Sequence, residues 1–286
     1  MKIVGIIAEY NPFHKGHEFH IEKAKKITGA DAAIIIMSGD YVQRGIPSIM
    51  PKHLRTQMAL ACGADVVLEL PVCYATGSAE YFATGEALGC VDYLCFGSEC
   101  GEIKILQQIA DVLCKETELY KVLLQKHLKN GNAFPAARKL AFIEYLGKNK
   151  SLSCIPEQIS AILDSPNNIL AIEYLKAFSF LNSSIEPVTI TREGAGYHDQ
   201  TLGGLFSSAS ALRQGLQDCE LTKNANHTPA INHILQELPQ NCHKIFKEHY
   251  HKCFPVFADD FSLLLKAKLL TETKDTLARY LDITPE

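Results

Sequence analysis

The sequence predicts an α/β fold, a Rossmann-like doubly wound parallel sheet of about five strands followed by an α-helical C-terminal part. Two observations predict it. Apolar runs alternate with helical patterns over roughly the first 100 residues, and these runs are apolar at nearly every position instead of at every second one. Strands of that kind are buried on both faces, as in parallel sheets that helices cover above and below.

The N-terminal elements form a βαβ series. Its first part predicts a strand at Lys2–Ala8, a loop at Glu9–Gly16, a helix at His17–Thr28 and a second strand at Ala32–Met37. The same alternation then predicts a helix at Pro51–Cys62, a strand at Asp65–Leu70, a helix at Ser78–Gly89 and a buried strand at Tyr93–Phe96.

Helices dominate the rest of the chain. The β-rich run Ile185–Thr191 is expected to return to the first sheet as a late strand, and the chain is helical from Ser208 onward. We expect an α/β domain at residues 1–215 with a helical insertion at about 103–180, and a helical C-terminal region at 216–286 whose completeness is left open. Helices of the insertion are predicted within Ile103–Leu128 and at Phe134–Gly147, Pro156–Leu163 and Asn167–Ala177.

Composition limits the partners. The formal net charge of −4 gives no general attraction to nucleic acid, so such a partner needs a local basic patch. Candidate patches are the basic stretches Lys23–Lys26, Lys126–Lys129 and Arg138–Lys139, although such stretches are more often solvated helix faces. The N-terminal apolar run stops at Ile7, too short for a secretory signal or a membrane span. These features predict a cytoplasmic protein without a membrane partner.

The cysteines and histidines predict no metal site. Ten cysteines are spread over the chain without a Cys-x-x-Cys pair, mostly in apolar stretches, so we expect reduced and buried thiols. The cluster Cys242, His243, His249, His251 and Cys253 has the residue types of a zinc site, but its spacing fits no standard zinc finger.

The loop after the first strand carries the strongest chemical signal. It holds His14-Lys15-Gly16-His17 at the edge of a parallel sheet where ligands bind, next to a helix N-terminus that attracts anions. Gly16 lets the backbone approach a ligand closely. The imidazoles of His14 and His17 can donate hydrogen bonds to phosphate oxygens as charge builds on them in a transition state. The competing interpretation is that the two histidines only cap the helix.

These residues resemble the nucleotidyltransferase superfamily with the HxGH motif, whose members form or transfer adenylates. Like those proteins, the chain has no GxGxxG loop after its first strand. A second segment, Phe206–Arg213, is similar to the Ser-Ser-Thr-x-x-Arg phosphate loop found late in that superfamily. Its Ser208, Ser210 and Arg213 are expected to converge on an anion, although alone the segment is explained equally well as a serine-capped helix.

Five segments make the resemblance more specific: Glu9–His17, Met37–Gly45, Phe96–Glu99, Pro166–Leu170 and Arg192–His198. Together they resemble the tRNA-Met cytidine acetate ligase family over residues 1–215, which marks this part as an ATP-binding domain. In that family ATP and acetate form acetyl-adenylate, and the acetyl group passes to N4 of the wobble cytidine of elongator tRNA-Met. The resemblance implies an ATP-dependent ligase whose partners are ATP, acetate and tRNA.

The resemblance also implies site residues, matched position by position. His14 and His17 would stabilise the phosphoryl charge, and Mg²⁺ is expected to arrive with ATP because it screens phosphate charge. Ser208, Ser210 and Arg213 would help pyrophosphate leave. The expected ATP contacts are Ile7, Ala8, Glu9, Tyr10, Asn11, Pro12, Phe13, His14, Lys15, Gly16, His17, Glu18, Phe19, His20, Gly97, Asn167, Asn168 and Arg192, with the choice between the two asparagines left open.

Several interpretations stay open at this point. Ser38-Gly39-Asp40 ends the second strand and is expected to face the acetate or the transferring phosphate, while Asp40 is equally well explained as a turn residue. One alternative function is an adenylyl- or cytidylyltransferase that acts on a small phosphorylated metabolite. Another is a nucleotide- or RNA-binding module without catalysis.

Overall fold

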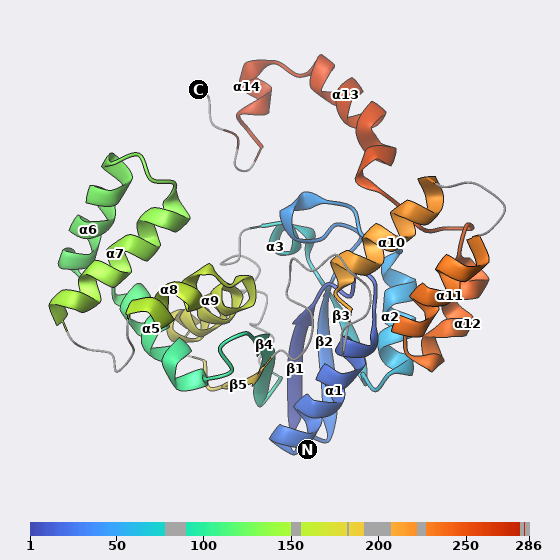
Figure 1. The fold of residues 1–286 in the computed structure, drawn as a ribbon, viewed down its shortest axis with the longest axis horizontal. Coiled ribbons are helices and arrows are strands. Elements are labelled where there is room, and N and C mark those ends of the chain that lie inside the picture. The colour runs from blue at the N-terminus through green and yellow to red at the C-terminus, as the bar shows by residue number, and fades with distance from the viewer. Residues whose placement is uncertain are drawn as a thin grey trace.

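The computed structural model describes residues 1–77, 90–149, 156–181, 183–191, 207–221, 227–280 and 283. The predicted helix Ser78–Gly89 and the predicted ligand Arg192 lie outside the described residues. Figure 1 shows a central sheet flanked by helices and continued by a helical C-terminal part, so the predicted fold class is confirmed.

Five parallel strands form the sheet, in the order β3-β2-β1-β4-β5. The last strand pairs with β4, which confirms that the late β-rich run returns to the first sheet. The chain moves outward from β1 to β2 and β3, and then crosses to β4 on the other side of β1. The carboxyl ends of strands at such a switch point border the crevice in which open α/β sheets bind ligands. The strands are β1 (Ile3–Ala8), β2 (Ala32–Ser38), β3 (Val66–Leu70), β4 (Tyr93–Ser98) and β5 (Glu186–Thr191).

The helices fall into three groups along the chain. The first group connects strands: α1 (Lys15–Thr28), α2 (Lys52–Ala61) and the short α3 (Val72–Ala75). The second is the predicted insertion between β4 and β5: α5 (Ile103–Lys115), α6 (Glu118–Lys129), α7 (Phe134–Asn149), α8 (Pro156–Asp164) and α9 (Pro166–Leu181). The third is C-terminal: α10 (Ala209–Leu221), α11 (His227–Glu237), α12 (His243–His249), α13 (Ser262–Thr271) and α14 (Lys274–Leu277).

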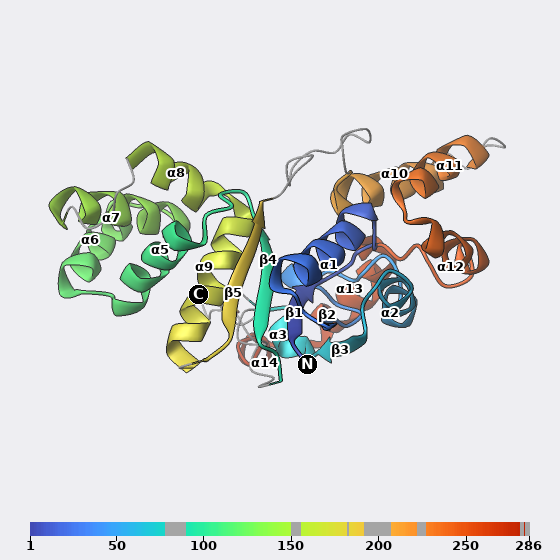
Figure 2. The same ribbon diagram turned by 90° about the horizontal axis from the view of Figure 1, so that it is seen from below.

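Helices cover both faces of the sheet, with the insertion on one side and α1, α2 and α10–α12 on the other (Figure 2). Ile35 and Ile36 are neighbours on β2 but belong to different hydrophobic cores, because successive side chains of a strand point to opposite faces. Ile35 shares its core with Leu212 of α10 and Phe246 of α12. Among the described residues, no helix is long and apolar enough to cross a membrane.

The local sequence places α1 directly behind the histidine loop. His14 is the N-cap, in an extended conformation, and its side chain accepts a hydrogen bond from the first turn. Ile21 and Ala24, three positions apart, bury one face of the helix. The helix ends at Gly29, whose φ of 62° lies in the left-handed region that favours glycine. The helix start is thereby fixed at the carboxyl edge of the sheet.

Candidate functional site

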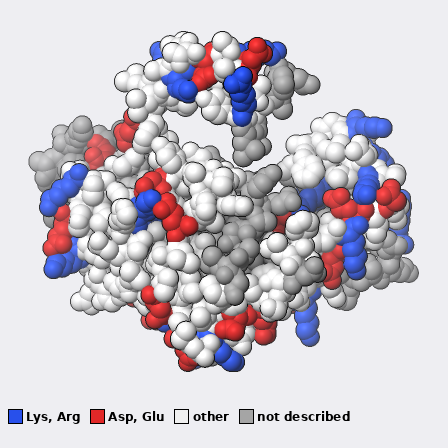
Figure 3. Space-filling model, turned by 180° about the vertical axis from the view of Figure 1, so that it is seen from behind, with Lys and Arg blue, Asp and Glu red and all other residues white. Residues whose placement is uncertain are grey.

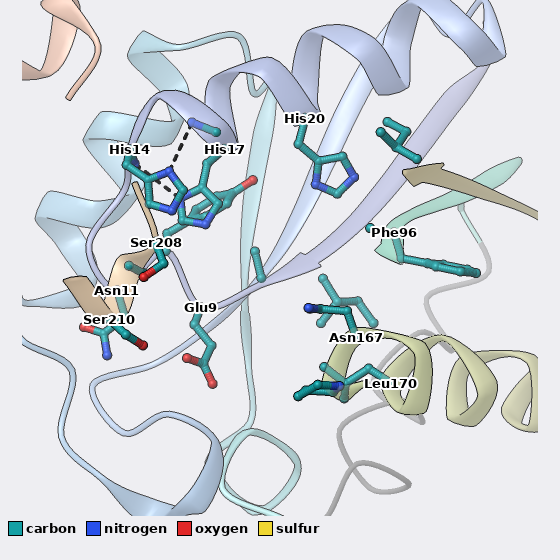
Figure 4. A pocket seen from close by; sticks show the side chains of 18 of the residues that line it. Glu9, Asn11, His14, His17, His20, Phe96, Asn167, Leu170, Ser208 and Ser210 are labelled. Atoms are coloured by element: carbon teal, nitrogen blue, oxygen red, sulfur yellow. Dashed lines mark hydrogen bonds between the residues drawn. The ribbon is translucent and has the colours of Figure 1, made fainter. Parts of the chain in front are cut away.

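A cavity of about 490 Å³ opens at the carboxyl edge of the sheet (Figure 4). Ile7 and Ala8 at the end of β1 line it, together with Phe96 and Gly97 at the end of β4. Residues of α1, α9 and α10 complete its wall. The volume lies in the range of small-molecule sites, and the position is the switch point between β1 and β4.

Two stacked imidazole rings form one wall of the cavity. The ring centroids of His14 and His17 lie 3.7 Å apart, with an angle of 28° between the planes. His14 Nδ1 accepts a hydrogen bond from Gly16 N–H at 3.1 Å, and His17 Nδ1 accepts one from His14 N–H at 3.2 Å. A neutral imidazole that accepts at Nδ1 carries its proton on Nε2. The histidines therefore cap the helix and are also Nε2–H donors, so the two interpretations from the sequence are compatible.

Aromatic side chains support the His17 ring. The ring centroids of Tyr10 and Phe13 lie 4.7 Å and 5.5 Å from that of His17. Both rings are buried, and burial raises the pKa of the Tyr10 hydroxyl. Tyr10 has a φ of 50°, a left-handed conformation that costs a residue with a side chain on the order of 1–3 kcal/mol. The packing of the Tyr10 ring maintains this backbone conformation and with it the path of the loop.

The start of α10 forms the adjoining wall. Ser208 Oγ accepts a hydrogen bond from Ala211 N–H at 3.0 Å, as expected of a capping serine. Arg213 donates to the carbonyl oxygen of Asn11 at 2.6 Å and to Ser210 Oγ at 2.9 Å. Arg213 thus joins α10 to the histidine loop, 202 positions earlier in the chain. One end of the cavity therefore combines a guanidinium, hydroxyl groups and imidazoles, a set of donors suited to phosphate.

The opposite end of the cavity is mainly apolar. Phe96 of β4, Leu170 and Tyr174 of α9 and Ile190 of β5 line it. Figure 4 shows Asn167 next to Leu170 on this side, across the cavity from the histidines. An apolar wall with one amide suits a flat heterocyclic base, while the other end suits its phosphates.

Glu99 distinguishes the two asparagines at the start of α9. Its carboxylate accepts hydrogen bonds from Asn167 Nδ2 at 2.6 Å and from Asn168 N–H at 2.9 Å. Asn168 is buried, and its Oδ1 accepts a hydrogen bond from Cys100 N–H at 2.9 Å. Of the two, Asn167 lines the cavity. Asn167 is therefore placed to meet a ligand, and Asn168 holds the segment after β4 against α9.

A model of the HIGH nucleotidyl transferase family matches residues 1–286. The chain belongs to this family. A tRNA(Met) cytidine acetate ligase of Alkaliphilus metalliredigens is 40% identical over 291 residues, which cover 99% of this chain and 66% of that protein. One of Clostridium botulinum strain Okra is 48% identical over 231 residues, 79% of this chain and 55% of that protein. The chain thus spans between 55% and 66% of the length of these relatives.

Solved structures of Thermotoga maritima TmcAL share the fold. The apo form I matches with a TM-score of 0.90 at 33% identity, over 99% of this chain and 65% of that one. The form bound with alpha-thio ATP matches with a TM-score of 0.85, also at 33% identity, over 99% and 64% of the two chains. Together with the relatives, these matches confirm the resemblance to the tRNA-Met cytidine acetate ligases within the HIGH nucleotidyltransferase family.

Most of the site residues expected from the family resemblance come together at the cavity. Pro12 and Phe13 are instead buried outside the cavity lining, Lys15 is exposed, and Glu18 lies near Cys62. The expected residues that line the cavity are Ile7, Ala8, Glu9, Tyr10, Asn11, His14, Gly16, His17, Phe19, His20, Gly97, Asn167, Ser208, Ser210 and Arg213.

The segment after β2 is only partly at the cavity. Asp40 Oδ1 accepts a hydrogen bond from Lys52 N–H at 2.8 Å, so this carboxylate stands at the start of α2. Neither Asp40 nor Ser38 lines the cavity, whereas Gln43 does. The turn interpretation of Asp40 fits this geometry.

Arg55 was not among the residues predicted from the sequence, yet it organises the loops of this HIGH nucleotidyltransferase site. Its guanidinium is fully buried in α2 and donates to the carbonyl oxygens of Glu9, Ser38, Gly39 and Met50. Burial lowers the pKa of Arg55 to about 10. The loops after β1 and β2 are thereby held by one cation. The available signal was an arginine on the apolar face of a helix, one position after Leu54 and three before Met58.

The cysteine and histidine cluster is dispersed. Cys242 packs against Cys62 with the sulfur atoms 3.5 Å apart, while His243 and His249 bond to backbone carbonyl oxygens of their own segment. His251 contacts Glu220. Within the described ranges, no three His, Cys, Asp or Glu residues are arranged to hold a metal ion.

The predicted basic patches are largely neutralised. Lys25 pairs with Asp65, Lys126 with Glu144 and Lys139 with Asp164, at 2.6–3.0 Å. The blue and red side chains are interspersed on the face shown in Figure 3. Each of the three stretches therefore contains at least one lysine that forms a local ion pair.

Proposed function

We propose that this chain carries the catalytic site of an ATP-dependent ligase, which activates acetate as acetyl-adenylate and transfers the acetyl group to N4 of the wobble cytidine of elongator tRNA-Met. One observation carries the proposal: two Nε2–H donors and the Arg213 guanidinium share one end of a cavity whose other end is apolar. The names of the relatives, and the alpha-thio ATP bound to the Thermotoga maritima protein, support it.

The polarity of the cavity orients the nucleotide. Adenine lies against Phe96, Leu170 and Tyr174, with Asn167 as a polar partner, and Gly97 leaves room for the nucleoside. The phosphates reach the histidine pair and the start of α10, whose helix N-terminus favours negative charge. The α-phosphate then lies between the two ends, near the end of β1.

In the first step an acetate oxygen attacks the α-phosphorus and pyrophosphate leaves. His14 and His17 donate Nε2–H to oxygens on which charge develops, in an arrangement that the backbone sets in advance. The Arg213 guanidinium neutralises part of the charge on the departing pyrophosphate, and the hydroxyl groups of Ser208 and Ser210 donate hydrogen bonds to it. Mg²⁺ carried on the ATP phosphates would screen their charge, because this ion commonly takes substrate phosphates as ligands.

In the second step the amino group of cytidine attacks the carbonyl carbon of the mixed anhydride. That bond is already activated, so the step depends mainly on positioning. No covalent enzyme intermediate is required.

Isotope exchange tests the proposal. The chain is incubated with ATP, labelled pyrophosphate and acetate, and label is expected in ATP only when acetate is present. Labelled acetate with unmodified elongator tRNA-Met is then expected to place label on cytidine. Exchange that is independent of acetate but requires a phosphorylated metabolite would instead support a nucleotidyltransferase. ATP binding without any exchange would support a binding module.

A further inference from the structure

We propose that Glu9 receives the exocyclic amine of the acceptor cytidine and takes its proton during acetyl transfer. The inference rests on the proposed function and assigns the proton acceptor that the second step needs. A base at this position also lets the site distinguish cytosine from uracil.

Glu9 lies at the centre of the cavity. It follows the last residue of β1 and is partly buried. Figure 4 shows its side chain between Ser210 and Asn11 on one side and Asn167 and Leu170 on the other. The acetyl-phosphate junction would occupy this middle position, because the base and the pyrophosphate take the two ends. Among the described residues that line the cavity, Glu9 is the one carboxylate.

Two hydrogen bonds fix the position of Glu9. Its Oε1 accepts from Gln43 N–H at 3.0 Å, and its carbonyl oxygen accepts from the buried Arg55 guanidinium. A carboxylate has about four lone-pair sites, and the bond from Gln43 N–H occupies one of them and orients the group. The loops after β1 and β2 thus present a fixed acceptor to the cavity.

The histidine pair is unsuited to accept a proton. Nδ1 of His14 and Nδ1 of His17 each accept a backbone N–H, which places the ring proton on Nε2. Both rings are therefore donors in their neutral form. The third imidazole of the cavity, His20, contacts Cys95 Sγ of β4 through Nε2 at 3.5 Å.

During adenylate formation the Glu9 carboxylate would repel the negatively charged phosphates, so it does not assist that step. We therefore assign its role to the second step. There, N4 forms a bond to the acetyl carbon, and the bond from that carbon to the phosphate oxygen breaks. AMP leaves with the electron pair, and the proton from N4 passes to Glu9. A carboxylate also accepts a hydrogen bond from the cytosine amine, whereas the O4 of uracil would face it with a lone pair.

The substitution Glu9→Gln tests the inference, because it keeps the size and the bond to Gln43 N–H but removes the base. Two measurements are compared with the unmodified chain: acetate-dependent pyrophosphate exchange, and single-turnover transfer from synthetic acetyl-adenylate to elongator tRNA-Met. We expect transfer to fall about 100-fold or more, and at least about tenfold further than exchange. Glu22→Gln, at an exposed position of α1, is the matched control and is expected to change neither.

Each outcome decides. An equal loss in both measurements would overturn the inference and point to Glu9 as a metal or phosphate partner in adenylation, and unchanged transfer would overturn it too. If thermal unfolding shows that Glu9→Gln is not folded, Glu9→Asp is measured instead, because it keeps a carboxylate base. It is expected to lower transfer more than exchange, and a larger loss of exchange would contradict the proposal. Absence of exchange in the unmodified chain would instead remove the proposed function, and the inference with it.

Discussion

Basic residues on helices have different roles at the cavity and on the helical insertion. At the cavity, Arg55 is fully buried and donates to backbone carbonyl oxygens of two loops. On the insertion, Lys126 and Lys139 pair with carboxylates at the surface, where such pairs typically contribute about 0–1 kcal/mol each. The sequence shows both as basic residues on helices. Their burial and their partners, rather than their number, identify the one that builds a site.

The largest effect is expected at the histidine pair. His17→Ala removes an Nε2–H donor and the Nδ1 acceptor of His14 N–H, so acetate-dependent pyrophosphate exchange should fall by about 100- to 1000-fold. Thermal unfolding should show that the fold persists. An exchange rate within about twofold of that of the unmodified chain would show that the cavity is not the site of adenylate formation.

Arg55→Met sharpens the comparison through stability. It leaves buried carbonyl oxygens without their donor, and the free energy of unfolding should fall by more than about 3 kcal/mol. Urea unfolding at constant m-value measures the change. A loss below 1 kcal/mol would show that the loops hold themselves without the guanidinium.

How much the sequence could predict follows the same division. The five strands, including the late one, were predictable because each apolar run signals its own burial. The histidine loop was predictable from its place after β1. Arg55 was not, because acceptors such as the carbonyl oxygens of Glu9 and Ser38 belong to other segments of the chain. The choice between Asn167 and Asn168 likewise depended on Glu99, which only the fold brings near them.

A smaller effect is expected at the start of α10. Ser208→Ala removes the acceptor of Ala211 N–H, which should cost about 1 kcal/mol of stability. If Ser208 also contacts pyrophosphate, the KM for pyrophosphate in the exchange reaction should rise in Ser208→Ala. In Ser208→Thr, which keeps a hydroxyl group, this KM should stay low. An unchanged KM in Ser208→Ala would reduce Ser208 to a cap.

The smallest effect is expected on the insertion. Lys139→Ala breaks a surface pair with Asp164 and should change the free energy of unfolding by less than about 1 kcal/mol, with exchange unaltered. The same urea and exchange measurements apply. A loss as large as that of Arg55→Met would contradict the distinction between the two regions.

The central claim is that the cavity at the carboxyl edge of the sheet holds ATP with its phosphates against the histidine pair. A crystal structure of this chain with a non-hydrolysable ATP analogue tests it most directly. The account predicts phosphate oxygens within hydrogen-bond distance of His14 and His17 Nε2, with adenine against Phe96 and Leu170. A nucleotide bound elsewhere, or one with its base at the histidines, would contradict it.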